Sequence, residues 1–258
     1  MVLSPNQVKE IKNLLRDKIK TKLKKYSRET TSMPFLVRLI QNEEQVASYS
    51  FIHSILTSLG MSIYEDVAKI IAKPNSQETD TKVDMNGLIS DAQTSVIEKI
   101  MNELRNGIRE ANKEKEIEEV LKASSENGKK QKDGAIADFF MKRNDIEHYF
   151  EIKTVKPNID VFTKSKKKIL EWVARKRKNI KTFLAFPYNP YYPEPYERFT
   201  EQGVLEKGNE FLIGKEFWDF LGGEGAYEEL LAIFDEVGKE LKESIQNKIK
   251  EVAKKKMS

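Results

Sequence analysis

Apolar positions recur at helical spacing through most of the first half of the chain and again at its end. Ser4-Pro5 is typical of a helix N-cap followed by proline, and the periodic apolar residues after it predict a helix from Pro5 to about Tyr26. After a short apolar segment at residues 33–41, the pattern predicts helical stretches over 44–72, with an interruption at Gly60, over 87–123 and over 226–256. Residues 74–84 are polar and are expected to form turns.

A different pattern follows, in which short apolar and aromatic runs replace the helical periodicity. Ala135–Lys142 and Glu147–Val155 are two such runs, and Arg143-Asn144-Asp145 between them is a turn signal, so they predict a β-hairpin. A helix over Ile159–Lys178 and a strand over Thr182–Phe186 come next. A strand, a helix and a strand in this order form a crossover unit, so we expect these two strands to be parallel.

The hairpin brings charged side chains to one face. Side chains alternate along a strand, so Glu151 and Lys153 share a face. A two-residue turn at Asn144-Asp145 places Asp138 opposite Glu151, with Cβ atoms roughly 5 Å apart. Two adjacent carboxylates repel each other unless a cation binds between them, and a divalent metal supplies that cation. Lys153 would then orient or deprotonate an attacking water, which predicts a metal-dependent hydrolytic site.

Asp133 competes with Asp138 for the role of the first acid. It precedes Gly134 at the head of the same strand, and in this register it lies about five residues beyond the pairing position, roughly 16 Å along the strand. A longer turn or a bulge would change that separation. Without such a change, Asp-Gly is simply a turn before a strand.

The composition narrows the chemistry of a metal site. The chain has no cysteine and two histidines, which excludes disulfides, thiol nucleophiles and zinc–thiolate sites. Carboxylates must then hold the metal, and oxygen ligands suit Mg²⁺, Mn²⁺ or Ca²⁺. We expect His148 on a half-exposed strand face and His53 in an apolar core, neither of them as a ligand.

The net charge of +4 is small, yet basic residues gather in one part of the chain. They are Lys164, Lys166, Lys167, Lys168, Arg175, Lys176, Arg177, Lys178 and Lys181. Such a cluster fits a phosphate-binding face, and a solvated helix face is the alternative. No apolar run reaches the roughly 18 residues of a membrane span, and the N-terminus lacks the pattern of a signal peptide, so we expect no membrane contact and a cytoplasmic location.

An acid on one strand followed by Glu-x-Lys on the next resembles the PD-(D/E)XK nuclease superfamily, although Ala137 stands where a proline precedes the acid in the superfamily's name. The segment Glu151-Ile-Lys-Thr-Val-Lys-Pro-Asn158 is similar to one in type II restriction endonucleases, notably the TdeIII-like group that recognises GGNCC-type sites. The helical segment Ser54–Glu65 and Tyr188-Asn-Pro-Tyr191 also resemble those enzymes, whereas the terminal helices carry no such resemblance.

The resemblance implies roles for individual residues. Asp138 and Glu151 would ligate Mg²⁺, for which Mn²⁺ is expected to substitute, with the carbonyl of Ile152 as a further ligand. Lys153 would act on the attacking water. Glu65, on the earlier helix, would be an additional catalytic acid that holds metal or water. Its alternative is an exposed glutamate that pairs with Lys69 four residues later.

The resemblance also implies a fold and a function. The expected fold is α/β, a restriction-endonuclease-like core with a mixed central sheet, a hairpin and a β-α-β crossover, and with extensive helical decoration. We expect a single domain over residues 1–258, mainly helical over 1–123, with the catalytic core at 130–190 and a C-terminal helix at 226–258.

The implied activity is Mg²⁺-dependent, sequence-specific double-strand cleavage of DNA that leaves 5′-phosphate ends. A palindromic site matches a two-fold dimer, so a homodimer bound to double-stranded DNA is expected. The alternatives are a structure-specific or repair nuclease of the same superfamily, for example a junction resolvase, and a non-catalytic DNA-binding or interaction protein.

Overall fold

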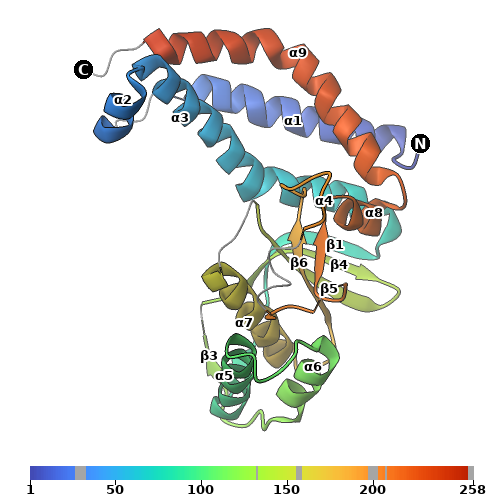
Figure 1. Ribbon diagram of the computed structural model, residues 1–258. Coiled ribbons are helices and arrows are strands. Elements are labelled where there is room, and N and C mark those ends of the chain that lie inside the picture. The colour runs from blue at the N-terminus through green and yellow to red at the C-terminus, as the bar shows by residue number, and fades with distance from the viewer. Residues whose placement is uncertain (27–32, 132, 155–158, 197–202, 207, 255–258) are drawn as a thin grey trace. The chain divides into compact units, whose positions relative to one another are not determined.

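The computed structural model describes residues 1–26, 33–131, 133–154, 159–196, 203–206 and 208–254. The described chain forms two compact units (Figure 1). Residues 1–67 and 228–258 contribute to a helical unit, and residues 68–227 form a sheet unit. The predicted end of the second hairpin strand at Val155 lies outside the described residues.

The helical unit is built from helices of 5 to 29 residues. They are α1 Pro5–Lys25, α2 Pro34–Ile40, α3 Glu43–Ser58, the π-helix η1 Leu59–Ile63, the start of α4 Tyr64–Ala72, and most of α9 Ala226–Lys254. The side chain of Ser4 accepts a hydrogen bond from the backbone of Gln7 and caps α1, as the sequence predicts. The expected interruption at Gly60 is a π-helical turn that joins α3 to α4.

The sheet unit has a five-stranded mixed sheet in the order β1-β4-β5-β6-β7 and a separate two-stranded sheet, β2-β3. The strands are β1 Glu78–Asp84, β2 Leu88–Ile89, β3 Lys129–Lys130, β4 Ile136–Arg143, β5 Ile146–Ile152, β6 Lys181–Phe186 and β7 Phe211–Ile213. Within the large sheet, β4 is antiparallel to both of its neighbours, while β5, β6 and β7 run parallel. This arrangement confirms the predicted mixed sheet and the restriction-endonuclease-like α/β class.

The hairpin has the register that the sequence predicts. Asn144 and Asp145 both have positive φ, 51° and 61°, as a two-residue turn of the I′ kind requires. The paired residues run from Arg143 opposite Ile146 to Phe139 opposite Phe150, so the next step places Asp138 opposite Glu151. The predicted crossover is also confirmed, because β5 and β6 are parallel and α7 Ile159–Lys176 connects them.

Helices cover both faces of the sheet within this unit. On one face α7 packs with Trp172 near Tyr149 of β5, and α5 Asp91–Arg105 and α6 Lys113–Lys122 lie beyond it (Figure 1). On the other face Phe150 and Phe183 pack against aromatic residues of α8 Lys215–Gly222. Trp172 is fully buried.

Two stretches differ from the sequence-based expectation. Residues 74–84, expected as turns, include the short 3₁₀ turn η2 Lys73–Asn75 and the edge strand β1. Side chains of β1 alternate between exposed and half-buried, so its sequence shows no apolar run. The stretch 87–123, expected as one helix, contains β2, α5 and α6, and Gly107 with φ 65° lies in the break between the helices.

Candidate active site

The hairpin brings Asp138 and Glu151 into one cluster. The backbone N–H of Ile152 donates to Oδ2 of Asp138 over 2.8 Å, which fixes this carboxylate against the partner strand. Glu151 is almost completely buried, at 3% exposed, and Asp138 is half-buried. The backbone N–H of Lys153 donates to the carbonyl of Ala185 over 2.9 Å, so the parallel pairing with β6 continues to Lys153.

Two lysines hold the carboxylate of Glu151. Nζ of Lys153 donates to Oε1 over 2.5 Å, and Nζ of Lys168 on α7 donates to Oε2. Both lysine side chains keep some contact with solvent. We call Asp138, Glu151, Lys153 and Lys168 the hairpin cluster. The role of Lys168 was not predicted, because the sequence shows it only as one member of a basic run.

The electrostatics of the hairpin cluster fit a divalent cation. Burial, and then the neighbouring Glu151 carboxylate, raise the pKa of Asp138 to about 6. A cation between the two acids would relieve that repulsion. Among the described residues no group of three or more His, Asp or Glu side chains forms a cation site. Mg²⁺ needs no more than one or two carboxylates, because it keeps several waters and shares phosphate oxygens of a substrate. The carbonyl of Ile152 as a further ligand stays a prediction.

One stripe of α7 positions this cluster. Lys168, Trp172 and Arg175 lie at helical spacing i, i+4 and i+7. The indole N–H of Trp172 donates to the carbonyl of Gly134 over 2.8 Å. The guanidinium of Arg175 donates to the carbonyls of Gln131 and Asp133 over 2.8 and 2.9 Å. The helix is therefore fixed to the segment that enters β4, and this spacing is the sequence signal that could have drawn attention to Lys168.

The two candidates for the first acid lie in different surroundings. Asp138 is half-buried beside Glu151, whereas Asp133 is exposed, in a turn before β4. The main-chain carbonyl of Asp133 accepts from Arg175. The geometry therefore favours Asp138.

Glu65 lies in the helical unit, in the first turn of α4. It is 6% exposed, so the alternative of an exposed partner for Lys69 is wrong. Lys69 instead forms an ion pair with Asp80 over 2.8 Å. The proposed catalytic role of Glu65 stays a prediction.

The basic run does not form one phosphate-binding face, and it is not a solvated helix face either. Lys166 and Arg175 are buried, while Lys164, Arg177, Lys178 and Lys181 are exposed. Within α7, helical periodicity turns neighbouring residues such as Lys164 and Lys166 toward different surroundings, and Arg177, Lys178 and Lys181 follow the end of the helix.

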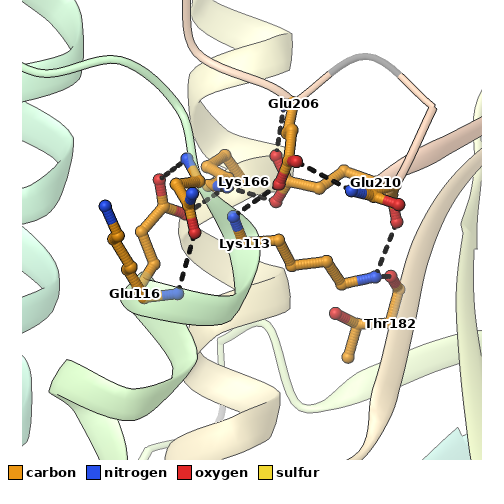
Figure 2. Close-up of polar contacts among 9 residues, drawn as sticks. Lys113, Glu116, Lys166, Thr182, Glu206 and Glu210 are labelled. Atoms are coloured by element: carbon orange, nitrogen blue, oxygen red, sulfur yellow. Dashed lines mark hydrogen bonds and ion pairs between the residues drawn. The ribbon is translucent and has the colours of Figure 1, made fainter.

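Lys166 belongs to a second group of charges, which we call the buried cluster: Lys113, Glu116, Lys166 and Glu210 (Figure 2). Nζ of Lys166 pairs with Oε2 of Glu116 and Oε1 of Glu210, and all three residues are fully buried. Oε2 of Glu210 also accepts the backbone N–H of Glu206 over 2.6 Å. Nζ of Lys113 donates to the carbonyls of Thr182 and Asn209 over 2.6 and 2.8 Å.

Both histidines differ from expectation. His148 is buried rather than half-exposed, because its ring packs between Phe183 and Phe220. His53 is exposed rather than in a core, and its ring stacks on Tyr49.

Comparison with known proteins identifies the family. Residues 3–238 match the family described as type II restriction endonuclease, HinfI. The chain belongs to the HinfI family of type II restriction endonucleases. This chain is 30% identical to the type II restriction enzyme MjaII of Methanocaldococcus jannaschii, over 72% of this chain and 54% of MjaII. It therefore spans about half the length of that relative.

Two further relatives come from Herpetosiphon aurantiacus. The HinfI-family chain is 27% identical to the type II restriction enzyme HgiEI, over 73% of this chain and 71% of HgiEI. It is 28% identical to HgiCII, over 77% of this chain and 75% of HgiCII. These matches confirm the predicted relation to restriction enzymes. They do not support the TdeIII-like group or a GGNCC-type site, which stays a prediction. In the part of the chain that the structure describes, no helix is long and apolar enough to cross a membrane.

Proposed function

We propose that this chain is a Mg²⁺-dependent type II restriction endonuclease that makes sequence-specific double-strand cuts in DNA and leaves 5′-phosphate ends. The observation that carries the proposal is the pairing of Asp138 with Glu151 on the hairpin of a HinfI-family chain, with Lys153 bound to Glu151. Two adjacent acids and a lysine are the groups that metal-assisted phosphodiester hydrolysis needs.

The side chains divide the work of hydrolysis. Asp138 and Glu151 would hold Mg²⁺, or Mn²⁺ in its place, and the bound cation would supply the Lewis acidity that lowers the pKa of water and polarises the phosphodiester. Lys153 orients the attacking water, because its backbone is fixed by Ala185 and its ammonium reaches Glu151. Glu65 is the proposed additional acid.

The proposed partners follow from the substrate. Double-stranded DNA with a palindromic site has two-fold symmetry, and a homodimer places one active site on each strand. The expected location is the cytoplasm, where such an enzyme meets DNA. GGNCC-type recognition is our working proposal for the site.

The direct test is digestion of genomic DNA with Mg²⁺, followed by sequencing of the fragment ends. The expected result is discrete fragments that share one recognition sequence and carry 5′-phosphates. Fragments with a different shared sequence would refute only the GGNCC-type proposal. If the purified protein binds plasmid DNA of random sequence normally but leaves it uncut with Mg²⁺, the endonuclease proposal fails.

A paired comparison tests the first acid. Asp138→Asn is expected to abolish cleavage, because it removes a proposed metal ligand, whereas Asp133→Asn should leave cleavage nearly unchanged. Both variants keep the side-chain volume, and a thermal unfolding curve confirms folding. Loss of cleavage in Asp133→Asn alone would show that the metal is not held by Asp138.

A further inference from the structure

The inference concerns Lys168 and rests on the proposed endonuclease function. Lys168 comes from α7, outside the Glu-x-Lys segment, and its Nζ donates to Oε2 of Glu151. Lys153 already occupies Oε1 of the same carboxylate. A buried carboxylate at the centre of a nuclease site therefore has an ammonium on each oxygen.

Lys168 is held in place by contacts beyond that ion pair. Its Nζ lies 5.4 Å from the centre of the Trp172 ring, within the range of a cation–π interaction. A Cβ atom added at Gly134 would lie 3.5 Å from Cγ of Lys168, so the stem of the lysine packs along the entry to β4. Trp172 itself is bound to Gly134. The ammonium is thus presented from a fixed helix, which lowers the entropy lost when it binds an anion.

Metal binding would change the partner of Lys168. A divalent cation on the Glu151 carboxylate repels an ammonium bound to the same group. Both ammonium groups keep some contact with solvent, with Lys153 31% and Lys168 20% exposed. Lys153 already has the proposed task of orienting the attacking water, which leaves the ammonium of Lys168 to turn toward an incoming phosphate.

The charge that develops during hydrolysis gives the Lys168 ammonium a role in catalysis. Water adds to phosphorus through its oxygen, the bond from phosphorus to the 3′ oxygen breaks, one proton of the water passes to solvent and the other to the 3′ oxygen. At the transition state phosphorus has five oxygen neighbours, and the phosphoryl group as a whole carries two negative charges on its oxygens. Asp138, Glu151, Lys153 and a divalent cation together leave one positive charge, and Lys168 adds the second.

We propose that Lys168 is a catalytic residue, which leaves Glu151 when metal and DNA bind and donates to a non-bridging oxygen of the scissile phosphate. The test compares Lys168→Met and Lys168→Arg with the control Lys167→Met, whose lysine is the neighbour on α7 and pairs with Glu98 at the surface. Three quantities are measured for each: the single-turnover cleavage rate at saturating DNA and Mg²⁺, the Kd for Mn²⁺ without DNA, and the thermal unfolding curve.

The expected result is a fall of about 10²-fold in the single-turnover rate of Lys168→Met, with partial recovery in Lys168→Arg and no change in Lys167→Met. The Kd for Mn²⁺ should stay equal or become lower in Lys168→Met, because a competitor for Glu151 is gone. A merely positioning role predicts the opposite: weaker Mn²⁺ binding, and a rate that returns to the wild-type value at high metal concentration.

Either that opposite pattern or an unchanged rate in Lys168→Met overturns the proposal. If Lys168→Met does not fold, Lys168→Arg tests the proposal instead. Its guanidinium can still donate to the phosphate, so its single-turnover cleavage rate should remain above that of Lys153→Ala. Failure of the proposed function is recognised separately, since the wild type and Lys167→Met would then also leave DNA uncut.

Discussion

Two lysines only two positions apart on α7 have opposite surroundings. Lys166 is fully buried in the buried cluster, where each of its carboxylate partners, Glu116 and Glu210, is also fully buried. Lys168 belongs to the hairpin cluster, where it and Lys153 retain contact with solvent beside Glu151. Each cluster consists of two acidic residues and two lysines.

The difference lies in how the charges are arranged. In the buried cluster Lys166 separates two carboxylates, and main-chain groups supply further hydrogen bonds, so the charges are paired within the protein. In the hairpin cluster the two acids are direct neighbours, and Asp138 has a raised pKa as a result of burial and of Glu151. The hairpin cluster thus has two neighbouring acids beside lysines that contact solvent, whereas Glu116, Lys166 and Glu210 of the buried cluster are closed to solvent. Only the hairpin cluster therefore has the access that a proposed cation site requires.

The largest expected effect comes from the hairpin cluster. Lys153→Ala should lower the cleavage rate on the order of 10²- to 10⁴-fold, because the attacking water loses its orienting group. Its thermal unfolding should change little, since Lys153 is half-exposed. The control is Lys164→Ala on the exposed side of α7, measured in the same single-turnover assay. Full activity in Lys153→Ala would show that the hairpin cluster, like the buried cluster, is not needed for cleavage.

Substitutions in the buried cluster should lower the stability of the fold rather than the cleavage rate. Lys166→Met leaves two buried carboxylates without their cation, which should lower the free energy of unfolding by about 3–5 kcal/mol. Denaturant unfolding measures this change, while the cleavage rate per folded molecule should stay near that of the wild type. Adding Glu116→Gln and Glu210→Gln should recover part of the loss. An undiminished unfolding free energy in Lys166→Met would mean that this cluster does not stabilise the fold.

The stability contributed by Lys113 of the buried cluster should depend on pH. Burial lowers the pKa of Lys113 from 10.5 to about 8, although Glu210 raises it. Between these two pH values the unfolded chain binds more protons than the folded one, so the contribution of Lys113 to stability should rise as the pH rises from 8 to 10.5. The measurement is the unfolding free energy of the wild type minus that of Lys113→Met across this window. A difference that is flat or falls with pH would contradict the expected sign.

The smallest effect is expected at the entry to β4. Gly134 has φ 69°, and an added Cβ would lie 2.8 Å from Oε2 of Glu171 on α7. Gly134→Ala should lower stability by about 1–2 kcal/mol through backbone strain, plus a small amount for moving the end of a flexible side chain. Gly107→Ala is the matched control, with φ 65° and no atom within 4 Å of the added Cβ. Equal losses in both variants would show that contact with α7 adds nothing.

The sequence predicts the pairing of Asp138 with Glu151 better than the rest of the fold, for a physical reason. Strand alternation and the turn at Asn144-Asp145 are local, and they suffice to bring Asp138 to Glu151. The edge strand β1 escapes sequence-based prediction, since its neighbour β4 supplies the pairing that its own polar residues do not indicate.

The separate surroundings of Lys166 and Lys168 depend on tertiary packing. The basic run on α7 looks uniform in the sequence. Lys166 is buried because Glu116 of α6 and Glu210, which precedes β7, pack against it. The burial of His148 likewise could not be predicted from its local sequence. Its burial comes from Phe220 on α8, a helix far along the chain from β5.

The two-residue turn at Asn144-Asp145 has a consequence for how this chain can diverge. Substitutions along β4 and β5 alter packing gradually, one side chain at a time. Insertion or deletion of a single residue in the turn would shift the pairing by a step and move Asp138 to the opposite face from Glu151. The length of the hairpin should therefore be far less tolerant of change than its composition, and a library of length variants would lose activity in one abrupt step.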